Sequence, residues 1–263
     1  MRDILNKLVF AFNYLVYFFT SDSKHDVHSP FVYDLVTRVF NQRKNKPIYH
    51  SFELIRTKMM RSKAVIEVLP IGAAGGEIKK VKLKDVAFNT SKSAKYAELL
   101  ERICEYYQPE FAIEIGTSLG ISAMYQASAL YNGRLWTLEG NPDSAKVARH
   151  NFEKLGFQNI ELLEGNFNET LPLLTSALPR IDYVFFDGNH SLEATLRYFE
   201  LCLAKAHEYT IFVFDDIRWS DDMQVAWQKI KNHEAVKVTV DLYAMGIVFF
   251  RTGQEKEHFT IRF

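Results

Sequence analysis

Hydrophobic and polar residues follow two different patterns along the chain. From about residue 94 onward, short apolar runs alternate with stretches of helical periodicity, which is typical of a parallel sheet covered by helices. Seven runs are predicted to be strands: Phe111–Ile115, Arg134–Glu139, Ile160–Glu164, Ile181–Asp187, Tyr209–Asp215, Ala235–Asp241 and Met245–Arg251. Because only the last two lack a helix between them, we predict a doubly wound α/β fold whose last strand runs antiparallel.

Residues 1–90 show a helical and irregular pattern instead. Two helices are predicted there, one opening at Ser29 and Pro30 as N-cap and first residue, the other around residues 51–62. We therefore predict two parts, a helical N-terminal cap over residues 1–90 and a ligand-binding domain over residues 91–263.

The N-terminal residues raise the question of a membrane. Residues 8–21 form an uncharged run of 14 residues, whereas about 20 are needed to cross a bilayer, and no small-residue cleavage site follows. The apolar residues Ile4, Leu5, Leu8, Val9, Phe12, Leu15, Val16 and Phe19 fall at helical spacing, with Asn6, Lys7, Asn13 and Tyr17 opposite. We predict a helix that docks on protein through this apolar face; contact of residues 4–19 with a membrane surface is the alternative.

Composition narrows the class of protein. Hydrophobic residues make up 48% and charged residues 24% of the 263 residues, which excludes a disordered chain. The two cysteines, Cys104 and Cys202, have no paired spacing, which excludes a disulfide scaffold and favours a reducing, cytoplasmic setting. Residues 1–90 carry 15 Lys and Arg against 8 Asp and Glu, and residues 91–263 carry 17 against 24. The overall neutrality argues against a nucleic-acid binder. The unequal charges predict either that the two parts attract each other or that the basic first part binds anions.

Polar residues follow the predicted strands at the edge where doubly wound sheets bind ligands. Gly116 and Gly120 allow a tight turn into a helix whose free N–H groups face that edge. Glu139 ends the next strand and suits ribose hydroxyls, and Asn166 follows the third strand, where it suits a base edge. The placement of such polar residues at the ends of successive strands favours an adenosyl ligand. Because Ser118 stands where the dinucleotide fingerprint has its second glycine, a nicotinamide-dependent oxidoreductase is disfavoured.

Three carboxylates are predicted to converge beside this site. Asp187 ends the fourth strand, and Asp215 and Asp216 end the fifth. Carboxylates this close repel one another, so a divalent cation, a proton or a nearby lysine such as Lys92 or Lys95 must neutralise them.

These motifs together carry a family resemblance. They are Glu114-x-Gly116-Thr117-Ser118-x-Gly120-x-Ser122, Leu138-Glu139-Gly140-Asn141, Phe186-Asp187-Gly188-x-His190 and Phe214-Asp215-Asp216. Over about residues 90–263 the chain resembles class I S-adenosylmethionine-dependent methyltransferases. It is most similar to the O-methyltransferase-like branch that includes catechol O-methyltransferase. The resemblance implies a mostly parallel, seven-stranded Rossmann-like sheet with its last strand antiparallel.

The resemblance also implies roles for individual residues. Glu114, Gly116, Thr117 and Ser118 would line the methionine end of the cofactor, Gly120 would shape the loop, Ser122 would bond the carboxylate, Glu139 the ribose and Asn166 the adenine edge. Asp187 would lie beneath the sulfonium. In metal-dependent members, an Asp after strand four and an Asp-Asn pair after strand five hold a divalent ion. Asp187 and Asp215 fit that pattern and Asp216 replaces the Asn, so Mg²⁺ is a possible second cofactor.

The predicted function is S-adenosylmethionine-dependent O-methylation of a small hydroxylated acceptor. His190, three residues after Asp187, is the candidate general base, although a histidine at a helix start can equally be structural. The alternative function is a non-catalytic S-adenosylmethionine-binding module that acts through its N-terminal segment.

Overall fold

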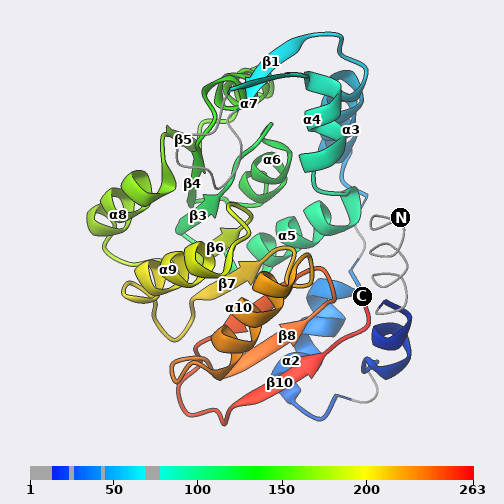
Figure 1. Ribbon diagram of the computed structural model, residues 1–263. Coiled ribbons are helices and arrows are strands. Elements are labelled where there is room, and N and C mark those ends of the chain that lie inside the picture. The colour runs from blue at the N-terminus through cyan, green and yellow to red at the C-terminus, as the bar shows by residue number, and fades with distance from the viewer. Residues whose placement is uncertain (1–13, 24–26, 43–44, 69–77) are drawn as a thin grey trace.

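The protein is described by a computed structural model over residues 14–23, 27–42, 45–68 and 78–263. Within these residues eight strands form the central sheet: β3 (Phe111–Ile115), β4 (Arg134–Glu139), β5 (Ile160–Glu164), β6 (Tyr183–Phe186), β7 (Ile211–Phe214), β8 (Val238–Asp241), β9 (Gly246–Phe249) and β10 (Glu257–Thr260). Their order across the sheet is β10-β8-β9-β7-β6-β3-β4-β5 (Figure 1). The strands pair in parallel except that β9 runs antiparallel to both β7 and β8.

The predicted fold class is confirmed, with one addition. All seven predicted strands form, and β3, β4 and β5 have the predicted bounds. The unpredicted eighth strand, β10, pairs in parallel with β8 and forms the edge of the sheet, while the antiparallel β9 lies between β8 and β7. Sequence patterning missed β10 because its residues, EHFT, include one large apolar side chain and the strand is held at the sheet edge by backbone pairing.

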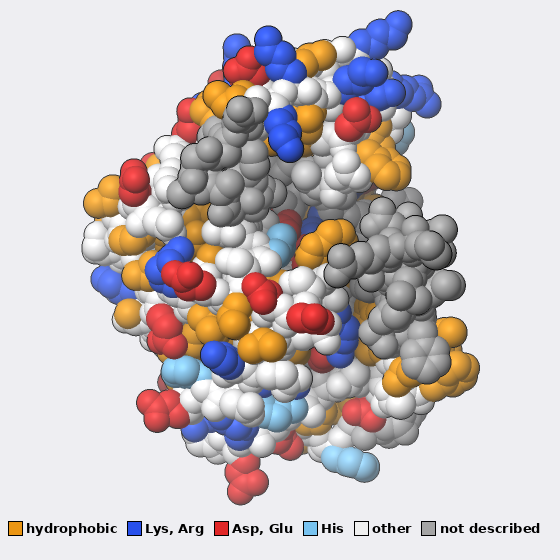
Figure 2. Space-filling view, viewed as in Figure 1, with side chains coloured by type: hydrophobic (Ala, Val, Ile, Leu, Met, Phe, Trp, Pro, Cys, Tyr) orange, Lys and Arg blue, Asp and Glu red, His pale blue; other side chains and the backbone are white. Residues whose placement is uncertain are grey.

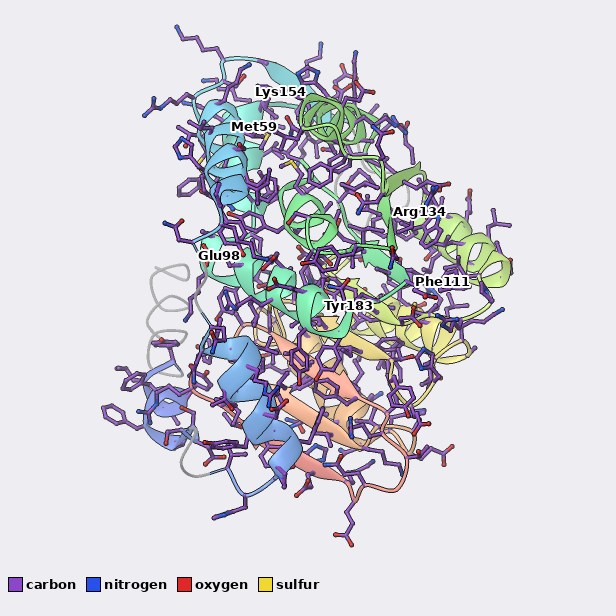
Figure 3. The ribbon with its side chains drawn as sticks, turned by 180° about the vertical axis from the view of Figure 1, so that it is seen from behind. Met59, Glu98, Phe111, Arg134, Lys154 and Tyr183 are labelled. Atoms are coloured by element: carbon purple, nitrogen blue, oxygen red, sulfur yellow. The ribbon has the colours of Figure 1, made fainter. Side chains whose placement is uncertain are left out.

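Two apolar layers hold the sheet between helices. In β6 all four residues are buried, and alternate side chains point to opposite faces, so Tyr183 and Phe185 join one hydrophobic cluster while Val184 and Phe186 join the other. The first face is covered by α5 (Ala94–Tyr107), α6 (Ile121–Ala127) and α7 (Pro142–Lys154), and the second by α8 (Phe167–Ala177), α9 (Leu192–Leu203) and α10 (Asp221–Asn232). Figure 3, in which the molecule is seen from behind, turns this first face toward the reader, with Tyr183 near the middle of the sheet.

The N-terminal segment packs on the first face as well. It contains α2 (Pro30–Leu35), a π-helical turn η1 (Val36–Phe40), α3 (Pro47–Met60), a hairpin of β1 (Val65–Val68) and β2 (Lys79–Lys82), and α4 (Leu83–Thr90). Both predicted helices form, although the Ser29 side chain makes no capping hydrogen bond. The hairpin was not predicted. Buried residues of this segment share one cluster with α5 and α6, and the predicted division at residue 90 stays a prediction.

Residues 14–20 are helical, but the side that docks differs from the predicted one. Tyr17, assigned to the polar side, is buried, and its hydroxyl donates to the carbonyl of Ile261 at 2.5 Å. Leu15, Val16 and Phe19, assigned to the docking face, are exposed. The reason is that the C-terminal residues supply a carbonyl partner for a phenol, which an apolar-periodicity argument cannot anticipate; residues 4–13 lie outside the described ones. No helix in the described part of the chain is both long and apolar enough to span a membrane.

Opposite charges of the two parts are in contact where Lys46, the residue before α3, lies against α5. Lys46 contacts the buried Glu101 and lies 2.9 Å from Glu105, and the Tyr49 hydroxyl donates to Glu101 at 2.7 Å. Figure 2 shows other Lys and Arg side chains gathered at the end of the molecule that β1, β2 and α4 form in Figure 1. The attraction expected from the sequence therefore acts through a few specific contacts, since most of the basic excess faces solvent.

Candidate functional site

The loop between β3 and α6 brings the backbone against the end of β6. Gly116 has φ +103°, and a Cβ placed on it would lie under 3.0 Å from the carbonyl oxygen of Asp187. The N–H groups of Gly116 and Thr117 both donate to the carbonyl of Leu138 at 3.0 Å, which ties the loop to β4. At Gly120 the φ is +85°, and a Cβ would overlap the ring of Phe152. Only glycine fits these two positions without displacing a neighbour.

Glu139, at the end of β4, is bound to this loop through its carboxylate. One oxygen accepts the N–H of Ser118 at 2.6 Å and the other accepts the N–H of Asn141 at 2.8 Å. Burial raises the pKa of Glu139 to about 7, although these backbone N–H bonds act in the opposite direction. Each oxygen keeps a lone pair for a further donor. The side chain can therefore hold the loop and still accept hydrogen bonds from a ligand.

Glu114 lies beneath the loop rather than at its surface. It is fully buried, and its carboxylate accepts from Thr137 at 2.5 Å and from Gln126 at 2.7 Å. Thr137 in turn shares a 2.5 Å hydrogen bond with Thr117. Burial raises the pKa of Glu114 to about 7. This chain of hydrogen bonds supports Thr117 from below, so Glu114 positions the loop instead of facing the cavity that the loop borders.

The raised pKa of Glu114 predicts a pH-dependent stability. Its carboxyl group ionises near pH 4.5 in the unfolded chain and near pH 7 in the folded one, so the folded state binds more protons between these values. The free energy of unfolding should therefore fall as the pH rises from about 5 to 8, by on the order of 3 kcal/mol for this group. Denaturant titrations of the wild type and of Glu114→Gln would measure it.

The variant supplies the control for this prediction. Glu114→Gln has no titrating group, so its stability should fall less steeply over the same pH range. Part of the slope remains in the variant, because burial raises the pKa of Glu139 to about 7 as well. Equal slopes for the two proteins would show that Glu114 is ionised in the folded chain throughout.

A small cavity lies where the loop, β6 and the N-terminal segment meet. It is lined by Thr90, Ser91, Lys92, Gly116, Thr117, Ser118, Leu119, Ile121, Ser122 and Asp187. The Thr90 and Ser118 hydroxyls are 2.6 Å apart, and the Ser91 hydroxyl oxygen is buried with no hydrogen-bond partner among the described residues. Sequence reasoning missed Thr90 and Ser91, because nothing in the local pattern after α4 indicates that this turn reaches β6. The unpartnered hydroxyl is a ready donor and acceptor for a ligand.

The carboxyl ends of β6 and β7 bring the predicted acidic residues together. His190 Nε2 lies 3.6 Å from Asp187 and 3.8 Å from Asp216, and Asp215 is almost fully buried beside them. Burial raises the pKa of Asp187, while the charges of Lys92 and His190 act to lower it. Asp187 and Asp215 share Lys92 as a partner, whereas Asp187 and Asp216 share His190. One of the two candidate lysines, Lys92, contacts Asp215 and lies 3.5 Å from Asp187.

Asn166 and Ser122 occupy different places relative to this cavity. The Asn166 side chain caps α8 by accepting the N–H of Asn168 at 3.0 Å, and the residue is exposed. The preceding Gly165 donates its N–H to the carbonyl of Glu139 at 2.9 Å, so Asn166 follows a turn bonded to the end of β4. Ser122 lines the cavity and its hydroxyl bonds Glu114. The Asn166 amide group is therefore exposed and available to a ligand, and the Ser122 hydroxyl lines the cavity.

The donor set does not fit the divalent cation that the resemblance implies. The ammonium group of Lys92 contacts Asp215 directly and lies 3.5 Å from Asp187. Asp216 is more than one-third exposed and its carboxylate is on the side of His190. Across the described residues, no group of three or more His, Cys, Asp or Glu side chains is arranged to hold a metal ion. A lysine therefore lies where the ion would need to bind.

A wider hollow lies at the opposite, amino-terminal edge of the sheet. It is lined in part by Arg180, Asp182, Lys205 and His207. Asp182 accepts from Arg180 and shares a hydrogen bond with His207, both at 2.8 Å, and Lys205 donates to the carbonyl of Leu178 at 2.9 Å. These polar groups satisfy one another, and parallel α/β sheets bind ligands at the other edge. The site is therefore assigned to the carboxyl edge.

The sheet order, the glycine turn after β3 and the acidic ends of β6 and β7 are those of a Rossmann-like methyltransferase fold. Residues 113–217 match the family model described as a methyltransferase domain. Solved structures agree on the fold. An O-methyltransferase from Bacillus cereus in complex with SAH has a TM-score of 0.58 and 18% identity, and covers 83% of this chain and 97% of its own. A SAH-bound methyltransferase from Podospora anserina has a TM-score of 0.59 and 16% identity, covering 86% and 97%.

The curated relatives that the chain resembles are O-methyltransferases. A catechol O-methyltransferase from Niastella koreensis is 31% identical over 47% of this chain and 55% of that protein. The Mycobacterium tuberculosis catechol O-methyltransferase is 31% identical over 48% and 56%. A transmembrane O-methyltransferase from Propithecus coquereli is 35% identical over 42% and 40%. The chain thus spans about half the length of the curated relatives it matches, and the resemblance read from the sequence is confirmed for this part.

Proposed function

We propose that the protein is an S-adenosylmethionine-dependent O-methyltransferase acting on a small hydroxylated acceptor. The observation that carries the proposal is the meeting of Gly116, Ser118 and Asp187 around one cavity, with Glu139 bonded to the same loop. The polar groups suit the cofactor because Ser91 offers an unpartnered hydroxyl at the cavity and the Glu139 carboxylate, bonded to the same loop, can accept further hydrogen bonds. Two of the similar proteins are catechol O-methyltransferases, which supports phenolic hydroxyl groups as acceptors.

In this proposal each residue has a defined task. Glu139 accepts the ribose hydroxyls, and Asn166 offers its amide to the adenine edge. Ser122 lines the methionine end, where its hydroxyl would turn from Glu114 to donate to the methionine carboxylate. S-adenosylmethionine, when bound, supplies an activated methyl group, so the acceptor oxygen bonds the methyl carbon while the electron pair of the broken S–C bond stays on sulfur. His190 Nε2 takes the acceptor proton, and Asp187 and Asp216 balance the positive charge that its ring gains.

The N-terminal segment is proposed to complete the site rather than to form a separate unit. The Glu67 N–H in β1 donates to Asp143 at 2.7 Å, and Asn141 donates to the Glu67 carbonyl at 3.0 Å, just after Glu139. Thr90 reaches the glycine loop from α4. The hairpin and α4 thus bracket the loop on two sides, which supports the predicted cap. A cytoplasmic setting also stays a prediction, supported by two buried cysteines that form no disulfide.

The proposed function is tested with the full chain, S-adenosylmethionine carrying a labelled methyl group, and pools of small phenols and alcohols. We expect calorimetric binding of S-adenosylmethionine and transfer of label to at least one hydroxylated acceptor. His190→Gln should bind the cofactor as the wild type does and lower turnover by about 100-fold, since general bases contribute about 10²–10⁴. Absence of cofactor binding would overturn the proposal. Binding without transfer to any pool would favour the non-catalytic binding module instead.

A further inference from the structure

Asp187 and Asp215, at the ends of β6 and β7, have the ammonium group of Lys92 beside them. The Nζ of Lys92 contacts Asp215 and lies 3.5 Å from Oδ2 of Asp187. All three side chains are largely buried, with 13%, 2% and 14% of their surfaces exposed for Lys92, Asp215 and Asp187. Buried carboxylates this close require a positive charge nearby. The lysine supplies that charge from within the chain.

Lys92 is held in this place by its backbone and its stem. It lies in the short connection between α4 and α5, and its carbonyl oxygen accepts a hydrogen bond from Arg56, a buried residue of α3. The ring of Phe185 in β6 lies with its centroid 5.9 Å from Nζ. These contacts hold the Lys92 backbone against α3 and place its ammonium group over the Phe185 ring. The ammonium position is therefore set by the packing of α3 and β6, not by the carboxylates alone.

A divalent ion and this ammonium group exclude each other. An ion bound by Asp187 and Asp215 would lie within a few ångströms of Nζ in a site of low effective dielectric, where like charges repel strongly. Moving the lysine away would leave its charge buried without a partner, which is costly. Asp216, the third predicted ligand, is oriented toward His190.

We propose that Lys92 replaces the divalent cation in the methyl-transfer site. An ammonium group has three donors. Two serve Asp215 and Asp187, and because Lys92 lines the same cavity as Gly116 and Ser118, the third can donate to the acceptor oxygen. That hydrogen bond stabilises the negative charge that develops on the oxygen as its proton passes to His190. This inference rests on the proposed function, since the acceptor oxygen is part of that proposal.

The test titrates Mg²⁺ into the full chain and its variants, with calorimetry and thermal melting as readouts that need no acceptor. The wild type should bind no Mg²⁺ at millimolar concentration, and its melting temperature should be the same in Mg²⁺ and in chelator. Lys92→Ala frees the carboxylates, so Mg²⁺ at about ten times its Kd should raise the melting temperature by about 4 °C. Lys92→Arg, which keeps the charge, should show no such rise.

Turnover supplies the second readout. Lys92→Ala should lower it by about 100-fold, comparable to the loss of one transition-state donor, and Mg²⁺ should restore part of it. Lys95→Ala is the matched control, because Lys95 is exposed and lies over the ring of Phe263, 4.4 Å from its centroid. It should behave as the wild type does.

Three outcomes would overturn the proposal: Mg²⁺ binding by the wild type, full turnover by Lys92→Ala, or a melting temperature of Lys92→Ala that does not change when Mg²⁺ is added. None of them bears on cofactor binding. If the wild type instead fails to bind S-adenosylmethionine in the absence of metal, the proposed function fails separately, and the Mg²⁺ titration still decides whether Lys92 occupies an ion site.

Discussion

Replacing Gly116 with alanine is expected to lower the free energy of unfolding by about 3 kcal/mol and to weaken S-adenosylmethionine binding by at least tenfold. At φ +103° an L side chain is strained, and its Cβ would overlap the backbone carbonyl of Asp187. The loop must then move away from β6, which separates the cavity-lining residues Thr117 and Ser118 from Asp187. Denaturant titration and calorimetry on the same preparation measure the two effects.

Gly253→Ala is the matched control for this variant. Gly253 also has a positive φ, +74°, but no described atom lies within 4 Å of the position that a Cβ would take there. Its substitution should cost only the backbone strain, about 1 kcal/mol, and leave cofactor binding unchanged. If both variants lose the same stability, the close approach of Gly116 to Asp187 does not constrain the loop.

Replacing Glu139 with alanine is expected to weaken S-adenosylmethionine binding by about 2 kcal/mol or more, which is roughly 30-fold. The variant loses the charged acceptor for the ribose hydroxyls and also frees the N–H groups of Ser118 and Asn141. Glu164→Ala is the control. Glu164 ends the neighbouring β5 but is exposed and pairs with Arg149 at 3.1 Å, so its loss should not change the affinity.

The pH dependence of binding gives a second test of Glu139. Because burial raises its pKa to about 7, the side chain is mostly protonated at pH 6 and mostly ionised at pH 8. Ribose hydroxyls donate to the ionised form, so cofactor affinity should rise with pH across this range and level off above it. Glu139→Gln should remove that rise. Equal affinity of the wild type and both Glu139 variants would mean that the ribose binds elsewhere.

The central sheet could be predicted from the sequence because its strands are decided locally. Strands buried on both faces, such as β6 and β7, are apolar at every position, and the helices between them have their own periodicity. The glycines, acids and amide at the strand ends could be aligned for the same reason, since parallel strands place their carboxyl ends at one edge. The first three strands were placed at their observed bounds by this reasoning alone.

Other features depend on partners that are distant in the sequence. β10 has no apolar pattern and forms because β8 offers an edge for it to pair with. Tyr17 is buried because the carbonyl of Ile261, 244 residues away, accepts its hydroxyl. The hairpin of β1 and β2 is anchored by Asn141 and Asp143, which no pattern within residues 65–82 could indicate.

The sequence by itself determined the class of fold, the edge of the sheet that carries the site, and the set of acidic residues there. It left open whether a divalent ion, a proton or a lysine balances those acids. Only the tertiary structure decided for Lys92, whose ammonium group reaches Asp215 across 123 positions of the chain. The reason is physical: strand and turn preferences act over a few residues, whereas the charge that neutralises a buried carboxylate is chosen by which side chains the packing brings within a few ångströms.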